Sequence, residues 1–414
     1  MDIYSVAVVG AGPAGSMAAI RSSQLKKNVI VIERNDVIGK KILLTGNGRC
    51  NITNTAPIEV FIKNFGKQGM FLKPAFFAFC NHNLMDFFKA QGLNFTIEDR
   101  GRVFPVTNKA LSVVSVLGEY LVKHRVKIVH NARVVKLERK DGLFQLALER
   151  SDHTMICAEK VILATGGVSY KKTGSSGDGF RIAEALGHTV VDLRPALIPL
   201  RIKETWIKQL QGLSLKDVRI SIKCGNKNVV SPRGELLFTH FGISGPLVLD
   251  VSSTVVSALG DNEKVMLAID FIPEVSHEQL QAHLLSECTA GRNPQIKSVI
   301  RNFLSQRLVS VFMQVLDIEM CKRANQITRK ERLLIAGLLK FFPLTVTGSL
   351  SIEGAMVTNG GISTKEIHSK TMESRVVPGL YFAGEMIDGC GKSGGFNLQQ
   401  AFSTGYLAGE KASA

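Results

Sequence analysis

The first apolar run of the chain is followed by a glycine-rich turn and then by a helical pattern. Residues 4–9 read YSVAVV, a short buried strand, and residues 10–15 read GAGPAG. Small and apolar residues at 16–20 continue into a helix, and a second buried strand at residues 28–32 ends in Glu33. This order of strand, G-x-G-x-x-G turn, helix and strand predicts a βαβ unit that binds a dinucleotide.

Each glycine of this turn has its own expected purpose. Gly10 permits the tight turn, Gly12 lets the backbone approach a pyrophosphate, and Gly15 lets the helix lie close to the strand. The N–H groups of the first helical turn would face the phosphates. The Glu33 carboxylate would accept hydrogen bonds from a ribose diol and repel a 2′-phosphate, which favours FAD or NAD over NADP. The predicted cofactor-binding residues here are Gly10, Gly12, Pro13, Ala14, Gly15 and Glu33.

Two later apolar segments favour FAD. Residues 160–167, KVILATGG, predict a buried strand that ends in a glycine turn, and residues 379–385, GLYFAGE, predict another. Glycines at 394–395 then open a helix that runs to about Ala412. The N-terminus of that helix would place positive dipole near the N1/C2 oxygen edge of a flavin and stabilise the reduced, negatively charged ring. The predicted contacts are Ala164, Thr165, Gly166, Gly384, Glu385, Asp388, Gly395, Phe396 and Asn397.

The middle of the chain has a different pattern. Residues 197–272 alternate turn signals with strand-like runs, which are predicted at 213–224, 229–238 and 264–272. Residues 276–341 have helical periodicity, as in 277–288 and 296–316, and strand-like residues resume near Leu344. No second G-x-G-x-x-G follows a strand in this region, so we expect no separate pyridine-nucleotide domain.

Composition places the chain among globular proteins. Its 414 residues are 45% hydrophobic and 21% charged, which excludes a disordered, collagen-like or low-complexity chain. We find neither an apolar stretch long enough to cross a membrane nor a signal peptide at the N-terminus, and we expect a soluble, cytoplasmic protein. The seven cysteines are scattered without a C-x-x-C pair, which argues against a disulfide framework and a zinc site.

The charge is strongly positive. There are 51 lysines and arginines against 35 aspartates and glutamates, a net charge of +16 that is spread along the chain. A diffuse positive field favours anionic ligands such as a dinucleotide or an acidic substrate. The densest basic run lacks interleaved aromatic residues, and we interpret it as a solvated helix face, with no nucleic-acid partner expected. This run comprises Lys322, Arg323, Arg329, Lys330 and Arg332.

Six stretches carry a resemblance to a known family. The most specific is residues 39–54, GKKILLTGNGRCNITN, which is similar to the signature of the bacterial BaiN-type (YhiN-like) NAD(P)/FAD-dependent oxidoreductases. Similarity to this family extends from about residue 4 to residue 410. The further matching stretches are residues 98–105, 173–179, 237–246, 357–362 and 371–375.

The resemblance implies an α/β fold. Such proteins have a glutathione-reductase-type, Rossmann-like FAD-binding domain that is split by an inserted β-barrel and a helical part. On this chain we expect the FAD-binding domain at 1–192 and 345–414, and the inserted substrate domain at 193–344. The β-barrel would occupy about 193–272 and the helical part about 273–344. The oligomeric state is not predicted.

The resemblance also implies site residues. By family position, Lys40, Lys41, Asn47, Arg49 and Cys50 lie near the flavin, and Gly46 and Gly48 shape the backbone around it. Arg34 and Val134 complete the predicted cofactor-binding set. Each of these residues also has a structural alternative: Arg49 in an ion pair, the two lysines as a solvated pair, and Cys50 as core packing, which we favour because no resolving cysteine is nearby.

Two side chains are candidates for proton transfer. His240, which follows the strand-like residues 235–238, is the best general acid, because a histidine has an unperturbed pKa of about 6.5. Tyr170 is the second, and Arg49 completes the predicted catalytic set by binding a carboxylate or phosphate with its two-pronged guanidinium. A structural histidine and a structural tyrosine are the alternatives. No metal-ligand cluster is found.

The predicted function is that of an FAD-dependent oxidoreductase. Hydride would pass between flavin N5 and a small organic substrate held between the flavin and the inserted domain, in either enone reduction or amine oxidation. NAD(P)H or oxygen would complete the second half-reaction. The positive charge keeps open an RNA-modifying or RNA-binding flavoprotein, and a non-catalytic flavin-binding or sensing protein is the third alternative. The loop 388–393, DGCGKS, departs from the D-x-D-G-x-T usual in the family, and Lys171 replaces a usual proline.

Overall fold

The computed structural model describes residues 3–149, 155–225, 227–289 and 293–414, and it divides into two compact units. Unit 1 comprises Met1–Ala196 and Ile352–Ala414, and unit 2 comprises Leu197–Ser351. Each unit has its own buried apolar cluster. Among the helices of the described residues, none combines the length and apolarity that crossing a membrane requires.

Unit 1 is built on a sheet with parallel strands at its centre. β1 (Ile3–Val9) lies between β2 (Val29–Ile32) and β9 (Met155–Leu163), and it pairs in parallel with both. The strand order is β6-β2-β1-β9-β8-β7, and β19 (Leu380–Phe382) also pairs in parallel with β9. The carboxyl ends of β1, β2, β9 and β19 therefore meet at one edge of the sheet, which is where α/β folds bind their ligands. The other strands are β6 (Lys127–Val129), β7 (Arg133–Lys140) and β8 (Leu143–Glu149).

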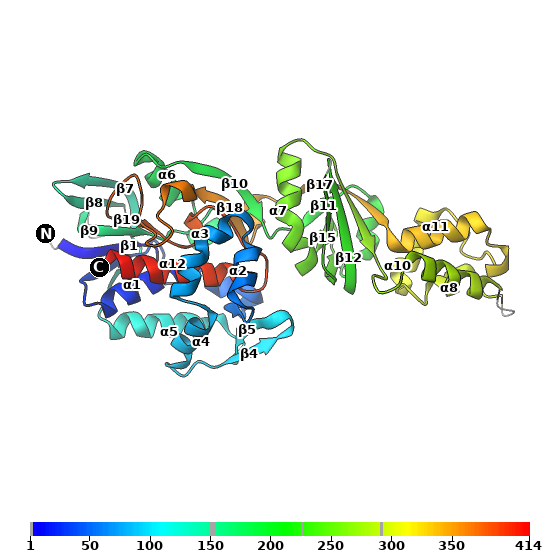
Figure 1. The fold of residues 1–414 in the computed structure, drawn as a ribbon, viewed down its shortest axis with the longest axis horizontal. Coiled ribbons are helices and arrows are strands. Elements are labelled where there is room, and N and C mark those ends of the chain that lie inside the picture. The colour runs from blue at the N-terminus through cyan, green and yellow to red at the C-terminus, as the bar shows by residue number, and fades with distance from the viewer. Residues whose placement is uncertain (1–2, 150–154, 226, 290–292) are drawn as a thin grey trace. The chain divides into compact units, whose positions relative to one another are not determined.

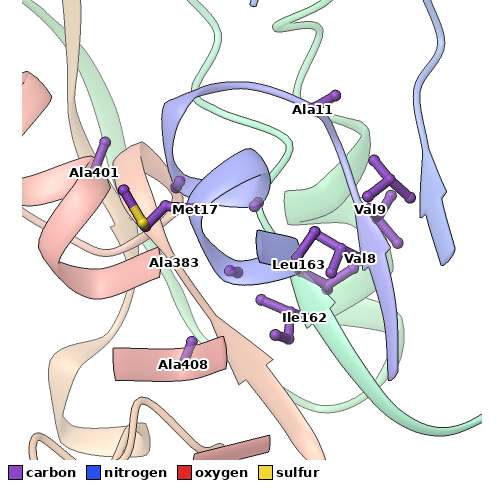
Figure 2. Close-up of a cluster of buried hydrophobic side chains, with 14 of the residues drawn as sticks. Val8, Val9, Ala11, Met17, Ile162, Leu163, Ala383, Ala401 and Ala408 are labelled. Carbon is purple, nitrogen blue, oxygen red and sulfur yellow. The ribbon is translucent and has the colours of Figure 1, made fainter. Parts of the chain in front are cut away.

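Helix α12 (Phe396–Ala412) packs closely against α1 (Pro13–Gln24), as Figure 1 shows in red and blue. A Cβ atom on Gly405 would overlap the carbonyl oxygen of Ala14, and one on Gly409 would overlap that of Ala18. The last helix of the chain is thereby held against the first, and Figure 2 shows the buried side chains around them. These include Val8, Met17, Ile162, Leu163, Ala383, Ala401 and Ala408.

Smaller elements complete unit 1. A short antiparallel sheet has the order β3-β5-β4, and a two-stranded sheet pairs β10 with β18. The strands are β3 (Thr53–Asn54), β4 (Phe95–Glu98), β5 (Arg102–Pro105), β10 (Val190–Ala196) and β18 (Val357–Ile362). The helices are α2 (Ile58–Asn64), α3 (Gly69–Ala78), α4 (Asn81–Lys89), α5 (Ala110–Lys123) and α6 (Asp178–Ala185).

Unit 2 combines an antiparallel sheet with helices. The strand order is β13-β12-β14-β15-β11-β17-β16, and β12 also pairs with β16, so the circuit of pairings returns to β12. The strands are β11 (Leu200–Ile202), β12 (Ser214–Cys224), β13 (Lys227–Val230), β14 (Gly234–Phe238), β15 (Gly242–Ser244), β16 (Val265–Asp270) and β17 (Phe342–Ser349). The helices are α7 (Pro246–Gly260), α8 (His277–Thr289), α9 (Ile296–Ile300), α10 (Gln306–Leu316) and α11 (Arg329–Lys340).

Three local predictions in unit 2 were wrong. The single strand expected at 229–238 is two strands, β13 and β14, because Pro232 between them has no N–H to donate. The single helix expected at 296–316 is α9 and α10, separated where Ser305 adopts an extended backbone. The basic run is also only partly helical, because α11 starts after Thr328, whose side chain accepts a hydrogen bond from the Glu331 N–H as a helix N-cap.

A pair of glycine substitutions tests the packing of α12 on α1. Gly405→Ala should destabilise the protein by about 1–3 kcal/mol, because the added Cβ would displace backbone. Gly337→Ala in α11 should stabilise it by about 0.5–1 kcal/mol, because its Cβ would meet nothing within 4 Å and alanine favours helix. Urea denaturation followed by circular dichroism measures both changes. Equal effects of the two alanines would contradict this account of the helix contact.

Candidate functional site

In the glycine turn after β1, two glycines are required by protein packing and the third leaves space for a ligand. Gly10 has φ +98°, and its Cβ would stand 2.6 Å from the carbonyl oxygen of Ala164, whereas a Cβ on Gly15 would overlap the carbonyl oxygen of Gly10. Protein packing therefore requires both glycines. A Cβ on Gly12 would meet no protein atom within 4 Å, although Gly12 is the N-cap of α1. The open space at this helix N-terminus fits a pyrophosphate.

Glu33 holds the turn from the end of β2. The Ala11 N–H donates to its Oε2 at 2.7 Å, and the N–H and Nδ2 of Asn35 donate to its Oε1 at 2.8 and 2.7 Å. Glu33 is buried, but its carboxylate has acceptor capacity beyond these bonds for a ribose hydroxyl. The Ala132 N–H donates to the Glu33 carbonyl at 3.0 Å, which places the predicted residue Val134 close by, at the start of β7.

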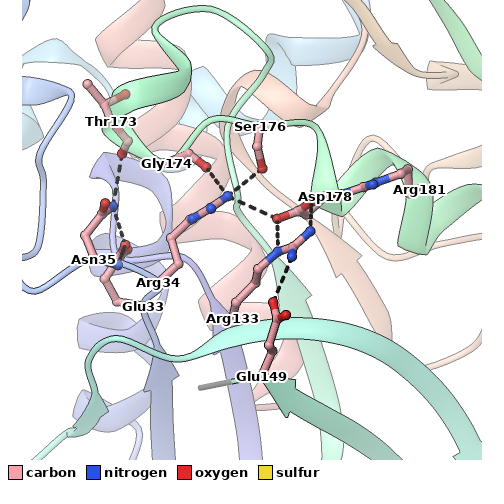
Figure 3. A network of polar contacts seen from close by, with 10 residues as sticks. All are labelled: Glu33, Arg34, Asn35, Arg133, Glu149, Thr173, Gly174, Ser176, Asp178 and Arg181. Carbon is pink, nitrogen blue, oxygen red and sulfur yellow. Dashed lines mark hydrogen bonds and ion pairs between the residues drawn. The ribbon is translucent and has the colours of Figure 1, made fainter. Parts of the chain in front are cut away.

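A polar network ties residues 173–178 to the chain after β2 (Figure 3). Asp178 accepts from Arg133 Nε at 2.8 Å and from Arg34 Nη1 at 3.1 Å, and it also bonds Arg181. The hydrogen bond from Arg133 is the main reason why the pKa of Asp178 lies well below its usual range, although burial opposes the shift. The predicted cofactor residue Arg34 also donates to Ser176 Oγ at 2.6 Å, so its guanidinium fixes this wall of the site.

The turn after β9 surrounds the partly buried carboxylate of Glu385. Lys41 Nζ donates to Glu385 Oε2 and to Ser169 Oγ, each at 2.7 Å, and the Thr358 N–H donates to Glu385 Oε1 at 2.8 Å. A Cβ on Gly167 would stand 2.8 Å from Glu385 Oε1. Burial raises the pKa of the Glu385 carboxyl, but Lys41 and the other donors outweigh it, so the pKa lies below its ordinary value.

Lys41 is therefore paired with a partly buried carboxylate, whereas the side chain of the neighbouring Lys40 is 40% exposed. Lys40 Nζ lies 3.6 Å from Asp36 Oδ1 at the surface. The predicted residues Ala164, Thr165 and Gly166 follow β9 directly, and Gly384 follows β19, so the tertiary fold brings the two predicted turns together.

In the turn before α12, some side chains bond or pack within the protein and thereby shape the loop. Gly395 is the N-cap with φ +97°, and the Asn397 side chain bonds both backbone groups of Gly391 at 2.8 and 2.9 Å. Phe396 is buried against Phe61, with ring centroids 4.8 Å apart. Asn397 and Phe396 thus shape the loop, and the N-terminal amides of α12 remain as the groups that could face a flavin edge. Asp388 accepts from Gln68 Nε2 at 2.8 Å, and burial raises its pKa.

The signature loop is a series of left-handed turns. Gly46, Asn47 and Gly48 all have positive φ and are exposed. Cys50 follows with φ +62° and is fully buried, and burial raises the pKa of its thiol to about 12. A thiol in that state carries no thiolate near neutral pH, which favours core packing over a reactive cysteine.

The three predicted catalytic residues are placed differently. Arg49 is in an ion pair with Glu98, as its structural alternative anticipated, and its Nε donates to Asn108 Oδ1 at 2.9 Å. Tyr170 follows Ser169, which bonds Lys41 and Glu385, so its backbone lies next to this hydrogen-bonded group in unit 1. His240 belongs to unit 2, where it is exposed in the turn between β14 and β15.

Three residues of the site, Asn51, Asn54 and Ser169, were not predicted from the sequence. The Asn51 Oδ1 atom is buried and accepts no hydrogen bond from the residues that the structure describes. Buried polar atoms are usually hydrogen-bonded, so a donor group of a bound ligand would satisfy it. Ser169 and Asn54 bond the two turns of the site. Asn51 and Asn54 lie within the quoted signature, which was the available signal, but Asn54 bonds the carbonyls of Arg100 and Gly394, which are far away in the chain. Together, the two open helix N-termini, the gap at Gly12 and the orphan amide oxygen fit FAD.

Comparison with known proteins covers the whole chain. A family model described as HI0933-like protein Rossmann domain matches residues 4–411. The chain is 30% identical over 409 residues to the 3-dehydro-bile acid delta(4,6)-reductase of Clostridium scindens, with 98% of each chain covered. It is 31% identical over 412 residues to the ribosomal RNA dihydrouridine synthase of Escherichia coli, with 99% of this chain and 98% of the relative covered.

Solved flavoprotein structures share the fold. A 3-ketosteroid delta1-dehydrogenase from Sterolibacterium denitrificans is 12% identical, with a TM-score of 0.56 over 100% of both chains. The open conformation of a flavocytochrome c3 fumarate reductase is 15% identical, with a TM-score of 0.54 over 100% of this chain and 78% of the other. The predicted α/β Rossmann-type fold is confirmed.

Proposed function

The chain belongs to the HI0933-like Rossmann-domain family and is an FAD-dependent oxidoreductase, and we propose that it reduces a carbon–carbon double bond conjugated to a carbonyl group. Membership of the family predicted from residues 39–54 is confirmed. The observation that carries the proposal is the full-length similarity to two relatives with one chemistry in common. The delta(4,6) double bonds of a 3-dehydro-bile acid are conjugated to its ketone, and dihydrouridine forms when the uracil double bond conjugated to a carbonyl is reduced.

Each group of residues in the site would have its own part in this reduction. Bound FAD, once reduced by NAD(P)H, would supply the hydride that adds to the β-carbon of the conjugated system. The amides at the N-termini of α1 and α12 would hold the pyrophosphate and the flavin edge. Lys41 and Glu385 would keep the turn after β9 rigid around the cofactor. We propose Tyr170 or His240 as the donor of the proton that the α-carbon takes up, which completes the addition of two hydrogens.

We propose uridine in RNA as the substrate, and a free enone as the second candidate. The net charge of +16 supports a polyanionic substrate, because a positive charge spread along the chain attracts many phosphates at once, whereas a bile acid carries a single carboxylate. The relatives from Escherichia coli and Haemophilus influenzae are both ribosomal RNA dihydrouridine synthases. These two relatives favour the RNA-modifying alternative over the small-molecule substrate that the sequence predicts. The bile-acid relative supports the free enone.

The test starts from the purified holoprotein. Its flavin is reduced anaerobically with NADH or NADPH, and RNA transcripts or enones are then added while the visible spectrum is followed. Amines are added to a separate anaerobic sample in which the flavin is still oxidised. We expect reoxidation by a uridine-containing transcript, with a gain of two hydrogen atoms in one uridine by mass spectrometry. Reoxidation by enones alone would establish the second candidate. Bleaching of oxidised flavin by an amine would establish amine oxidation, and no turnover with any pair would leave a flavin sensor.

A further inference from the structure

We propose that Arg49, Arg102 and Lys109 form a binding site for an RNA phosphodiester at the edge of the flavin site. The inference rests on the proposed function and names the part of the substrate that this surface would hold. Arg49 was predicted to bind a carboxylate or a phosphate, and the proposed site joins it with Arg102 and Lys109 in contact with the nucleic-acid backbone.

The two arginines share one acid. Glu98 forms an ion pair with Arg49 through Oε1, and its Oε2 lies 3.4 Å from Arg102 Nη2. Both guanidinium groups lie against Phe104, with Cζ atoms 4.1 and 5.7 Å from the ring centroid. One carboxylate between two guanidinium groups leaves net positive charge, and both arginine side chains are 38% exposed. The exposed Lys109 follows Asn108, which accepts the hydrogen bond from Arg49.

The existing bonds leave donors free for a further anion. Arg49 uses Nε for Asn108 and Nη2 for Glu98, and Arg102 uses Nε for the Asp99 carbonyl at 3.2 Å and Nη2 for Glu98. A guanidinium has five N–H donors, so the Nη1 group of each arginine can still bind a phosphate oxygen. The aromatic ring and the shared carboxylate hold both groups in place, which lowers the entropy lost on binding.

Asn54 connects this cluster to the flavin site. Its Nδ2 donates to the carbonyl of Arg100 at 2.9 Å and to the carbonyl of Gly394 at 3.0 Å. The backbone of Thr53 is so close to Gly395 that a Cβ there would overlap it. The loop between β4 and β5 therefore borders the glycine turn that precedes α12. If the base of a nucleotide reached a flavin at this turn, the sugar-phosphate backbone of that nucleotide would lie beside Arg49 and Arg102.

A phosphodiester suits this surface better than a carboxylate of a small acid. Both arginine side chains are 38% exposed and Lys109 is exposed, with Glu98 and Asp99 as neighbouring acids, so these cations can contact an anion that lies along the surface. We call this exposed surface the rim. An RNA strand presents phosphates at regular intervals along such a rim, and sequence-independent contacts to them position the base that enters the site. The guanidinium fork also matches the geometry of phosphate oxygens.

The experiment measures RNA binding by the holoprotein. A fluorescently labelled, uridine-rich RNA is titrated with wild type, with the double variant Arg102→Gln/Lys109→Gln, and with the control Lys136→Gln/Lys140→Gln. The control removes the same charge from exposed positions of β7. Anisotropy is recorded at several salt concentrations, and the visible spectrum verifies that each variant retains FAD.

We expect the rim variant to bind RNA about 10-fold more weakly at low salt, with a salt slope smaller by about one to two, because each lost phosphate contact lowers it by about one. The control should change affinity less than about two-fold. Equal losses in both variants, or no loss in the rim variant, would overturn the assignment. A rim variant that lost only affinity for a carboxylate-bearing enone would also overturn it. Failure of the proposed function is distinct, since wild type would then leave uridine unreduced whatever the variants bind.

Discussion

Replacing Gly12 by valine should give a folded protein that no longer retains FAD. The backbone of Gly12, with φ −73° and ψ −173°, is extended and open to any residue, and a Cβ there would meet no protein atom within 4 Å. The valine side chain would instead fill the space at the N-terminus of α1 in which the pyrophosphate would lie. We expect affinity for FAD to fall at least about 100-fold, equivalent to about 2.7 kcal/mol.

The measurements separate binding from folding. Dissociation of FAD is followed by its fluorescence, and unfolding of the apoprotein by circular dichroism. Apoprotein stability should change by about 1 kcal/mol or less, the usual difference between glycine and a non-capping residue at an N-cap. Gly15→Val is the contrasting variant, because its Cβ would overlap the Gly10 carbonyl and should prevent correct folding. A yellow Gly12→Val protein would show that the cofactor lies elsewhere.

The second large effect is expected for Lys41→Met. This variant leaves the partly buried carboxylate of Glu385, whose side chain is 18% exposed, without the ammonium group that lies 2.7 Å away. Removing one partner of a fully buried ion pair costs about 3–5 kcal/mol, and we expect about 2–3 kcal/mol here, because the remaining carboxylate keeps some contact with solvent. Lys40→Met is the matched control, since Lys40 is 40% exposed and its ion pair with Asp36 should contribute less than about 1 kcal/mol.

The pH dependence of this pair should change sign. In wild type the pKa of Glu385 lies below its ordinary value, so the pair stabilises the fold above the unfolded pKa of about 4.3 and loses this contribution as pH falls. In Lys41→Met, only the hydrogen bonds from Thr358 and Ser169 still oppose burial, so that pKa should rise and the variant should lose stability as pH rises above about 4.3. Urea denaturation across this range measures the slope, and Glu385→Gln in the same background should remove it. Parallel slopes for wild type and Lys41→Met would contradict the ion-pair account.

Much of the fold was predictable because its signals are local. The strand at 4–9, the glycine turn and the strand at 28–32 correspond to β1, the N-terminus of α1 and β2, and the helix expected up to Ala412 is α12. A buried strand and an N-terminal glycine are specified by neighbouring residues alone. The errors at 229–238 and 296–316 arose where one proline or one extended residue interrupts a continuing apolar pattern.

The contents of the site were harder to predict. The sequence could nominate Arg49, Lys41 and Glu385, but their partners depend on contacts between distant parts of the chain. Lys41 meets Glu385 across 344 positions, and Asn54 meets Gly394 across 340. The sequence therefore could not decide whether Arg49 binds an anionic ligand or forms an ion pair within the protein. The structure places Glu98 and Phe104 beside it.

The amino-acid sequence by itself determined that this protein has a dinucleotide turn between two buried strands and belongs to a flavin-dependent family, because glycine spacing and apolar periodicity act over a few residues. Only the tertiary structure decided which glycine faces open space, which lysine pairs with Glu385, and which two arginines share Glu98. Those properties depend on the relative positions of segments that are far apart in the chain, and packing alone sets these positions.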